Sequence, residues 1–331
     1  MTKPLLAFLC SFALSVVLMP IIIKFFKKKQ ASQTVLGYVE NHKEKNGTLT
    51  MGGVVFMLTT LGLSFYFLNF NNSWFVVLLV SVFYGVLGLM DDYLKIKFKQ
   101  NLGLRAYQKI IGQVGISLIF AIFIYFSTIG GEMFLPFSEK TIDVGFWVIP
   151  IIVLVMVATT NSVNLTDGLD GLAGNVTNIY LIFFVIIMML LQNKLYMSGE
   201  TGAIIQNMKD INVLSMLFVG AILGFLMFNT NKASIFMGDT GSLCLGGFVG
   251  ASACMLGQEL LIPILGFCFV FSAISVILQV VSFKLRRKRI FKMAPFHHHL
   301  QMSGLKEPRI VAIYSAVTAV IGVVVTIFYC L

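Results

Sequence analysis

The sequence predicts an all-α, polytopic integral membrane protein of about ten transmembrane helices, and three observations support this prediction. Of its 331 residues, 58% are hydrophobic and 11% are charged, and the mean hydropathy is +0.91. A soluble domain has roughly 45–50% apolar and about 25% charged residues. Long apolar runs recur along the chain, and lysine and arginine gather in alternate connections between them. We therefore expect the chain to cross a lipid bilayer repeatedly.

Ten apolar runs are long enough to cross the hydrocarbon core, which takes about 20 helical residues. They begin near Leu5, Met51, Trp74, Ala106, Phe146, Leu172, Val213, Ser242, Leu260 and Ile310. The first run is too long for the apolar part of a signal peptide, and no small-residue cleavage site follows it, so we expect it to be retained. No linker or internal repeat divides the chain, and residues 1–331 are expected to form a single transmembrane catalytic domain.

The distribution of basic residues predicts the orientation. Twenty of the 24 lysines and arginines lie in alternate connections, which are residues 24–50, 91–109, 161–171, 229–240 and 284–309. The positive-inside rule makes these connections cytoplasmic, so that both termini lie outside. The same connections contain five of the seven aspartates, and three of the four histidines form the run His297 to His299 in the last of them. This clustering predicts an active site at the cytoplasmic face of the membrane.

The net charge of +10 follows mainly from this topology, with some attraction to anionic lipid head groups and phosphorylated substrates. It does not indicate a nucleic-acid partner. The five cysteines lie in or beside apolar runs, without paired spacing or nearby histidines. They therefore suggest neither a disulfide framework nor a zinc site.

The first cytoplasmic connection ends in a glycine-rich segment, Lys45 to Gly53. Its glycines allow close backbone approach, while Lys45 and Thr50 offer a positive charge and a hydroxyl group to a phosphate or a nucleotide. The spacing is not that of a P-loop. A turn followed by a helix N-cap at Thr50 explains this segment equally simply, and taken alone the segment favours that alternative.

Two adjacent acids, Asp91 and Asp92, end the third apolar run. Carboxylates at the end of an apolar helix are costly unless water, a cation or a basic partner meets them. Successive helical residues diverge by about 100°, so the two carboxylates are not expected to form one bidentate clamp. Lys109 and Arg105 are candidate partners. The alternative is a helix end that emerges into water, with weak surface ion pairs.

The densest polar pattern runs from Asn161 to Gly174. Asn161, Asn164, Asp167 and Asp170 recur every three residues, and such residues converge only if the helix breaks or tightens, which the intervening glycines permit. Carboxylate and amide oxygens suit a hard cation such as Mg²⁺. A purely structural polar connection would not require two acids, two asparagines and three glycines together.

A further acid, Asp239, stands where the eighth run begins, after Asn229 and Phe236. Helix capping by Asp239, Thr240 or Ser242 competes with a functional role. Phe236 offers a ring on which a base could stack, although a single aromatic residue at a membrane boundary is more often an anchor.

The last inner connection contains a basic run, residues 284–292, followed by His297, His298 and His299. The basic run is typical of topogenic or lipid-contacting segments. Imidazoles could bind a pyrophosphate or transfer protons, whereas a zinc site is disfavoured because adjacent histidines diverge and no thiolate is near.

Together these segments closely resemble the phospho-N-acetylmuramoyl-pentapeptide transferases, the MraY family of the polyprenyl-phosphate sugar-1-phosphate transferases. The resemblance covers most of the chain and rests on Lys45 to Gly53, Met90 to Asp92, Lys109 to Gln113, Asn161 to Ala173, Phe236 to Ser242 and Ala294 to Gln301. The chain departs from the family pattern at Leu49, where proline is usual, and at Leu305, where tryptophan is common.

The resemblance implies a Mg²⁺-dependent transfer of phospho-MurNAc-pentapeptide from its uridine diphosphate carrier to undecaprenyl phosphate, which yields lipid I and UMP in the bacterial plasma membrane. The implied catalytic residues are Asp91, Asp92, Asp239 and His297. Asp239 is the candidate Mg²⁺ ligand, with Asp167 as a second. Substrate-binding roles would fall to Lys45, Thr50, Lys109, Asn161, Asn164, Asp167, Asp170, Asn229, Phe236, His298 and His299. Membrane lipid is an expected partner, and the sequence leaves a homodimer open.

Two other interpretations remain open from the sequence. A cation-coupled transporter would explain acids in apolar surroundings, but it predicts acids near the middle of the membrane on several helices. Here the acids gather at one face, next to glycine-rich loops and histidines, which disfavours transport. The same chemistry with another nucleotide sugar is the nearer alternative, because related transferases share the paired aspartates and the Asp-Gly-Leu-Asp-Gly segment. A covalent aspartyl intermediate also remains open.

Overall fold

Helices make up almost all of the regular structure. The computed structural model describes residues 2–29, 47–70, 72–98, 103–127, 129–138, 140–199 and 202–331. The long helices are α1 (Thr2–Lys28), α2 (Val54–Phe67), α3 (Asn72–Lys97), α4 (Ala106–Tyr125), α5 (Val148–Thr166), α6 (Leu172–Met197), α7 (Ala203–Asn229), α8 (Gly238–Cys254), α10 (Phe267–Arg286) and α12 (Glu307–Cys330). Short helices are α9 (Ile262–Leu265), α11 (Phe296–Met302) and the 3-10 helices η2 (Gly145–Trp147) and η3 (Glu259–Leu261).

The prediction of an all-α, multi-pass membrane protein is confirmed. Each of the ten predicted apolar runs contains a helix, and among the described residues eight helices are long and apolar enough to cross a membrane. The other two are shorter, because α2 has 14 residues and α8 has 17. A helix of 14 residues is about 21 Å long, less than the roughly 30 Å of a hydrocarbon core. Ten crossings therefore remain a prediction.

One small sheet was not predicted. Strands β1 (Glu132–Phe134) and β2 (Thr141–Asp143) form an antiparallel pair in the connection between α4 and α5. The backbone N–H of Phe134 also donates to the carbonyl of Gly257, which ties this pair to the segment after α8. The strands are three residues long, too short for an alternating hydrophobic pattern to reveal.

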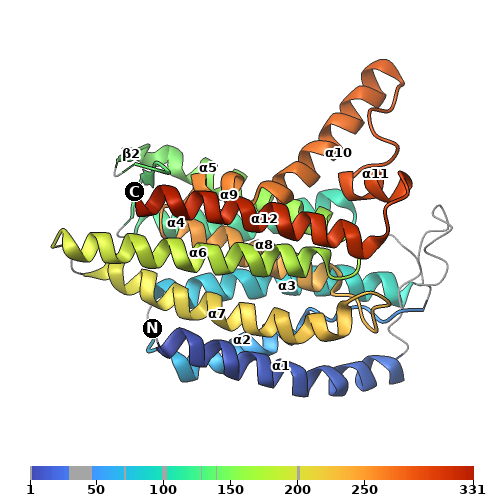
Figure 1. Ribbon diagram of the computed structural model, residues 1–331, viewed down its shortest axis with the longest axis horizontal. Helices are drawn as coiled ribbons and strands as arrows, with labels where there is room; N and C mark the ends of the chain where they lie inside the picture. The colour runs from blue at the N-terminus through green and yellow to red at the C-terminus, as the bar shows by residue number, and fades with distance from the viewer. Residues whose placement is uncertain are drawn as a thin grey trace.

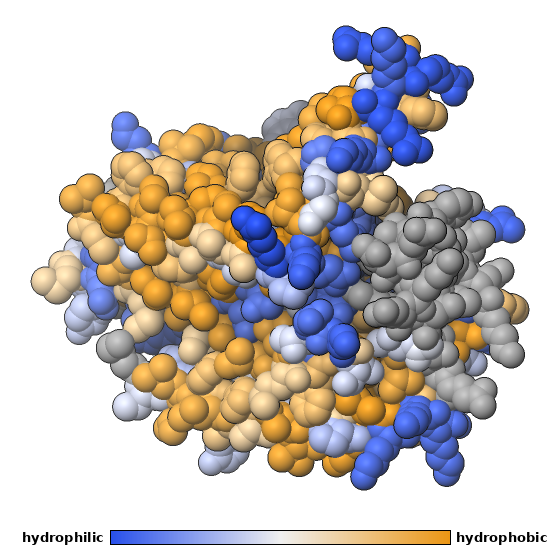
Figure 2. Space-filling view, turned by 45° about the vertical axis from the view of Figure 1, so that its right-hand side comes forward, coloured by the Kyte–Doolittle hydropathy of each residue, from blue (hydrophilic) through white to orange (hydrophobic). Residues whose placement is uncertain are grey.

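The helices lie side by side along one axis (Figure 1). Both termini and β2 lie at one end of the bundle, whereas α11 lies at the other. Helix α10 leans away from the bundle at the end that carries α11 (Figure 1). Apolar side chains cover the flanks of the molecule, and hydrophilic side chains gather toward the α11 end (Figure 2). The apolar flanks are what a lipid-facing surface requires.

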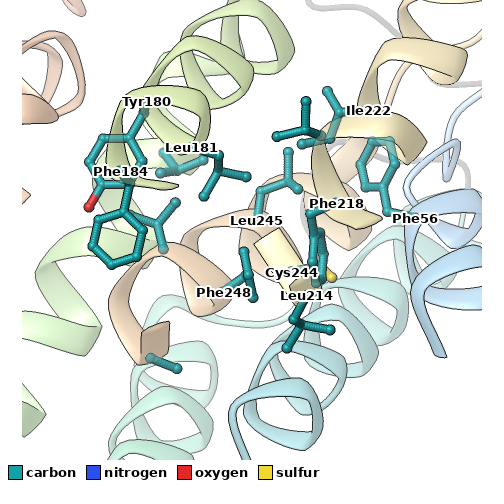
Figure 3. Packing of buried hydrophobic residues seen from close by; sticks show 14 of the residues in the cluster. Phe56, Tyr180, Leu181, Phe184, Leu214, Phe218, Ile222, Cys244, Leu245 and Phe248 are labelled. Carbon is teal, nitrogen blue, oxygen red and sulfur yellow. The ribbon is translucent and has the colours of Figure 1, made fainter. Parts of the chain in front are cut away.

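Helix α8 lies at the centre of the bundle. All its residues from Thr240 to Cys254 are buried, and its sequence is rich in glycine, serine, alanine and cysteine. Small residues allow helices to approach closely in a membrane. Figure 3 shows Leu245 and Phe248 of α8 between Leu181 and Phe184 of α6 on one side and Leu214, Phe218 and Ile222 of α7 on the other. Because α8 is enclosed in this way, its first residues have a fixed position.

Candidate active site

Three carboxylates meet where α3 ends and α8 begins. One oxygen each from Asp91, Asp92 and Asp239 lies within 4.8 Å of the other two. Asp91 and Asp92 are buried in the last turns of α3, and Asp239 is partly buried in the first turn of α8. The sequence placed these three acids on one side of the membrane, and the fold brings them into a single cluster.

Two lysines balance this negative charge. The ammonium of Lys95 lies 2.6 Å from Asp91 Oδ2, 3.0 Å from Asp239 Oδ2 and 3.9 Å from Asp92 Oδ1. Lys109 of α4 lies 3.0 Å from the same oxygen of Asp239. Lys109 was among the predicted residues, but Lys95 was missed. Its spacing of three and four residues from the two aspartates was the available signal, because such residues are neighbours on a helix.

Asp92 is bonded to the start of α8. Its carboxylate accepts hydrogen bonds from the backbone N–H of Asp239 at 3.2 Å, the backbone N–H of Thr240 at 2.9 Å and the Thr240 hydroxyl at 2.7 Å. No side chain at the start of α8 caps its own helix. The alternative in which Asp239, Thr240 or Ser242 is a local cap is therefore wrong, and the Asp239 carboxylate is free to face the lysines.

The two asparagines of α5 have different partners. The Asn164 amide donates to Asp239 Oδ1 and to the Ser242 hydroxyl, each at 2.8 Å. Asn161 instead exchanges hydrogen bonds with Gln113 of α4, at 2.8 and 3.4 Å. Asn164 thus orients the central acid directly, whereas Asn161 joins α4 to α5 one turn deeper in the bundle.

Helix α5 ends at Thr166, a break that the glycines after it permit, and Gly171 takes a left-handed conformation with φ of 75°. Among the described residues no hydrogen bond to the Asp167 carboxylate is found. Burial, together with the charges of Asp239, Asp92 and Asp170, raises the pKa of Asp167 well above its usual range. This acid is therefore available to a ligand that supplies positive charge or a donor.

Asp170 and Asn229 link the connection between α5 and α6 to the connection between α7 and α8 through hydrogen bonds to the backbone. Asp170 accepts the backbone N–H of Ala233 at 3.1 Å. The Asn229 amide accepts from Gly171 N–H and donates to the Ile235 carbonyl. Both of its functional groups are thus used by the backbone, so the structure gives Asn229 a supporting position beside the site.

The glycine-rich segment after the first connection pairs with the segment that precedes α8. Phe236 donates its backbone N–H to Leu49 and accepts the N–H of Gly52, both at 2.8 Å. The N-cap of α2 is Gly53, so the expected cap at Thr50 is wrong. The Thr50 hydroxyl is buried and has no partner among the described atoms. Lys45 lies outside the described residues.

The three histidines separate into two roles. His297 is fully buried, and neither ring nitrogen has a partner within the described chain. Its Nε2 lies against Gly168, where no β-carbon would fit, and His298 Nε2 lies close to the same glycine. Burial, followed by the effect of His298, lowers the pKa of His297 well below its usual range. His299 instead accepts the backbone N–H of Lys292 at 3.1 Å, which fixes the loop.

The chemistry of this cluster fits a hard divalent cation. Carboxylate oxygens are the ligands that Mg²⁺ prefers, and Mg²⁺ usually keeps several waters while it bridges one or two carboxylates to substrate phosphates. The oxygens of the three acids lie close enough together for such an ion, although both oxygens of Asp92 already accept hydrogen bonds from the start of α8. The nearby Lys95 and Lys109 could also contact the oxygens of a phosphate.

Known proteins resemble this chain over almost all of its length. The profile of the family described as glycosyl transferase family 4 matches residues 74–257. The chain is 40% identical to a phospho-N-acetylmuramoyl-pentapeptide-transferase of Halalkalibacterium halodurans, over 94% of this chain and 92% of that protein. The proteins of the same name from Clostridium novyi and Caldanaerobacter subterraneus are 41% and 40% identical, over 95% and 96% of this chain and 93% and 96% of theirs.

Proposed function

This chain belongs to glycosyl transferase family 4 and to its phospho-N-acetylmuramoyl-pentapeptide transferases, and we propose that the cluster of Asp91, Asp92 and Asp239 is its catalytic centre. The enzyme transfers phospho-MurNAc-pentapeptide from UDP-MurNAc-pentapeptide to undecaprenyl phosphate, forming lipid I and UMP in peptidoglycan synthesis. It is a multi-pass membrane protein of bacteria.

The observation that carries the proposal for the site is the meeting of the three acids with two lysines at one end of the bundle. The reaction brings together a lipid phosphate and a diphosphate, so the site must neutralise several negative charges. The ammonium groups of Lys95 and Lys109 lie 3.0 Å from Asp239, where they can also reach phosphate oxygens. A site at the end of the bundle admits a water-soluble nucleotide sugar and a membrane lipid together.

Mg²⁺ is the proposed cofactor, with Asp239 as its main ligand. Asp91 lies beside Asp239, and Asp167 has a carboxylate without a hydrogen-bond partner among the described residues, so it is the second candidate ligand. When bound, the ion would offset the repulsion between the attacking phosphate and the diphosphate.

Catalysis by this chain's own residues would consist of positioning and proton transfer. An oxygen of the lipid phosphate forms a bond to the sugar-proximal phosphorus, and the bond from that phosphorus to the bridging oxygen breaks, so that UMP leaves with the electron pair. Asp91 accepts the proton of the lipid phosphate where that phosphate is protonated. Lys95, 2.6 Å from Asp91, and Lys109 hold the charged phosphates in line.

We assign the nucleotide and sugar to the loops around this centre. Phe236 is partly exposed and would stack on the uracil, with Thr50, Asp167 and Asp170 beside it. His297 and His298 lie against Gly168 and would donate to the pyrophosphate or the sugar. The remaining predicted contacts are Lys45, Asn161, Asn229 and His299, of which the last three support the site through their own hydrogen bonds.

The defining experiment uses two parallel reactions, each with purified protein, undecaprenyl phosphate and Mg²⁺. One reaction receives UDP-MurNAc-pentapeptide and the other receives UDP-N-acetylglucosamine. Release of UMP and formation of a lipid product with the muramoyl substrate alone are expected. Turnover with the other sugar alone would move the substrate assignment to a sister branch. For the metal, Asp239→Asn should lower both activity and Mg²⁺ affinity, and a variant that kept both would overturn that assignment.

The orientation and the assembly are also proposals. The distribution of basic residues favours a cytoplasmic active site with both termini outside. Exposed Cys330 lies at the C-terminal end, so a membrane-impermeant maleimide should label it in intact cells. Protection of Cys330 until the cells are lysed would reverse the orientation. A homodimer remains a proposal, which native mass spectrometry of the detergent complex would test.

A further inference from the structure

The carboxylate of Asp92 is committed to the backbone of another helix. The first N–H groups of any α-helix lack partners within the helix. In α8 the N–H groups of Asp239 and Thr240 donate to Asp92 instead, and the Thr240 hydroxyl adds a third hydrogen bond. The Asp92 side chain is also buried, with 3% of the residue exposed. An acid that accepts three donors in a buried position has little freedom to move toward a substrate.

Two glycines make this contact possible. Gly88 lies one helical turn before Asp92 on the same face of α3, and a β-carbon there would lie 2.6 Å from the Thr240 nitrogen. Gly238 has φ of 71°, and a β-carbon on it would collide with Asp92 Oδ2 and lie 2.8 Å from the Thr50 hydroxyl. Both positions require glycine so that α3 and the start of α8 can touch. The contact is therefore built into the sequence on both helices.

The adjacent acid, Asp91, has different partners. Its Oδ1 accepts the backbone N–H of Leu104 at 2.7 Å, and its Oδ2 lies 2.6 Å from the Lys95 ammonium. Asp91 thus faces the lysine, the loop before α4 and the Asp239 side chain, whereas Asp92 accepts the backbone N–H groups of α8. Neighbouring helical residues point about 100° apart, which explains why two identical side chains meet different surroundings.

We propose that Asp92 is a positioning residue, which holds the N-terminus of α8 and thereby sets the place of Asp239, and that it is neither a metal ligand nor a proton acceptor. Asp239 is the second residue of α8, so a shift of the helix start moves its carboxylate away from Lys95, Lys109 and Asn164. The consequence for turnover rests on the proposed function, whereas the consequence for the backbone of α8 does not.

The test compares Asp92→Asn with the matched variant Asp91→Asn by hydrogen exchange of the Mg²⁺-free protein. An asparagine at position 92 must turn an N–H₂ group toward backbone donors, so the peptide covering residues 236–243 should exchange on the order of tenfold or more faster. Asp91→Asn should leave that peptide near the wild-type rate, because the N–H groups of Asp239 and Thr240 donate to Asp92, whereas Asp91 bonds Leu104, Lys95 and the Asp239 side chain. Equal exchange in the Asp92 variant and the wild type would overturn the proposal.

Thr240→Val provides a second test that leaves Asp92 in place. It removes the hydroxyl donor but keeps the backbone N–H, so the same peptide should exchange faster, by less than in Asp92→Asn. The effects of the two substitutions on turnover should be less than additive in the double variant, because both act on one contact. Fully additive effects would contradict a shared mechanism.

Binding of Mn²⁺, followed by electron paramagnetic resonance without substrate, separates a positioning role from a ligand role. A positioning role predicts that Thr240→Val and Asp92→Asn both lower the affinity for Mn²⁺. It also predicts faster hydrogen exchange of residues 236–243 in both variants. Asp92 would instead be a metal ligand if Asp92→Asn lost Mn²⁺ binding at a normal rate of hydrogen exchange while Thr240→Val bound Mn²⁺ normally. If the substrate assignment were wrong, turnover would fail in every variant, while the exchange results would still decide this proposal.

Discussion

Replacement of Gly88 by alanine should displace the central acid without touching it. The β-carbon would lie 2.6 Å from the Thr240 nitrogen and closer still to the carbonyl group of Asp239, whereas β-carbons essentially never approach another heavy atom within 3.0 Å. The difference between 3.0 and 2.6 Å requires α3 and α8 to separate by at least 0.4 Å, and by more at the Asp239 carbonyl. Both partners are backbone, so no side-chain rotation can relieve the collision.

A displacement of this size should be felt mainly in catalysis. A misplacement of about 1 Å can cost on the order of 100-fold in rate, so we expect kcat for UMP release to fall by about 10- to 100-fold. Overpacking in a well-packed interior costs about 1–3 kcal/mol, and the gain from replacing a helical glycine by alanine, about 0.5–1 kcal/mol, offsets part of this. The folded protein should therefore survive, as thermal unfolding in detergent would show.

Two other glycines serve as controls. Gly85, one turn earlier on α3, would meet the flexible end of the Met57 side chain at 2.6 Å, so Gly85→Ala should affect stability more than turnover. Gly115 of α4 has open space around its missing β-carbon, so Gly115→Ala should keep normal turnover. If folded Gly88→Ala released UMP within twofold of the wild-type rate, the contact between α3 and α8 would not control the geometry of the site.

Three further substitutions test separate parts of the structure. Lys95→Met removes the ammonium shared by three carboxylates, so the rate of UMP release should fall at least 100-fold. A decrease of less than threefold across a Mg²⁺ titration would contradict a direct role of Lys95. His297→Leu breaks no hydrogen bond within the described chain, so thermal stability should stay near that of the wild type while turnover falls at least tenfold. Lower stability with normal turnover would instead show that His297 has a packing role. Burial raises the pKa of Glu259 to about 8, above the ordinary 4.5, so the wild type should lose stability as the pH rises from about 4.5 to 8. Glu259→Gln should remove that pH dependence and raise the unfolding temperature at pH 7. If the unfolding temperature of the wild type stayed constant from pH 5 to 8, Glu259 would not be desolvated.

The positions of the helices along the chain could be predicted from hydropathy, but their packing could not. Every predicted apolar run contains a helix, because about 20 apolar residues are a strong local signal. The same signal did not reveal that α8 is enclosed on all sides or that α2 is short. Hydropathy does not distinguish a face that meets lipid from a face that meets other helices. The small residues of α8 were the available signal for close packing, but they do not identify the partner helix.

The composition of the site was predictable, but the tasks of its residues were not. The positive-inside rule grouped the acids on one side, and the structure brings Asp91, Asp92 and Asp239 together. The local alternatives failed at Thr50 and Asp239 because segments far apart in the chain meet at both positions. Before α2, the N–H groups of Gly52 and Gly53 donate to the carbonyls of Phe236 and Met237. The start of α8 is capped by an acid about 147 positions earlier in the chain, and such a contact leaves no local pattern. Lys95 was missed because a lysine near the end of an apolar helix is also what topology alone requires.

The paired aspartates show why a short acidic motif can carry more than one task. A role of both carboxylates toward the substrate would not by itself explain the glycines at positions 88 and 238, whose missing β-carbons lie closest to the backbone of α8, to Asp92 and to Thr50. The structure places both glycines against the contact between Asp92 and α8. In the proposed mechanism, Asp91 faces the phosphates while Asp92 holds the helix that carries Asp239. Loss of activity in either variant alone would not distinguish these tasks, whereas the movement of α8 would.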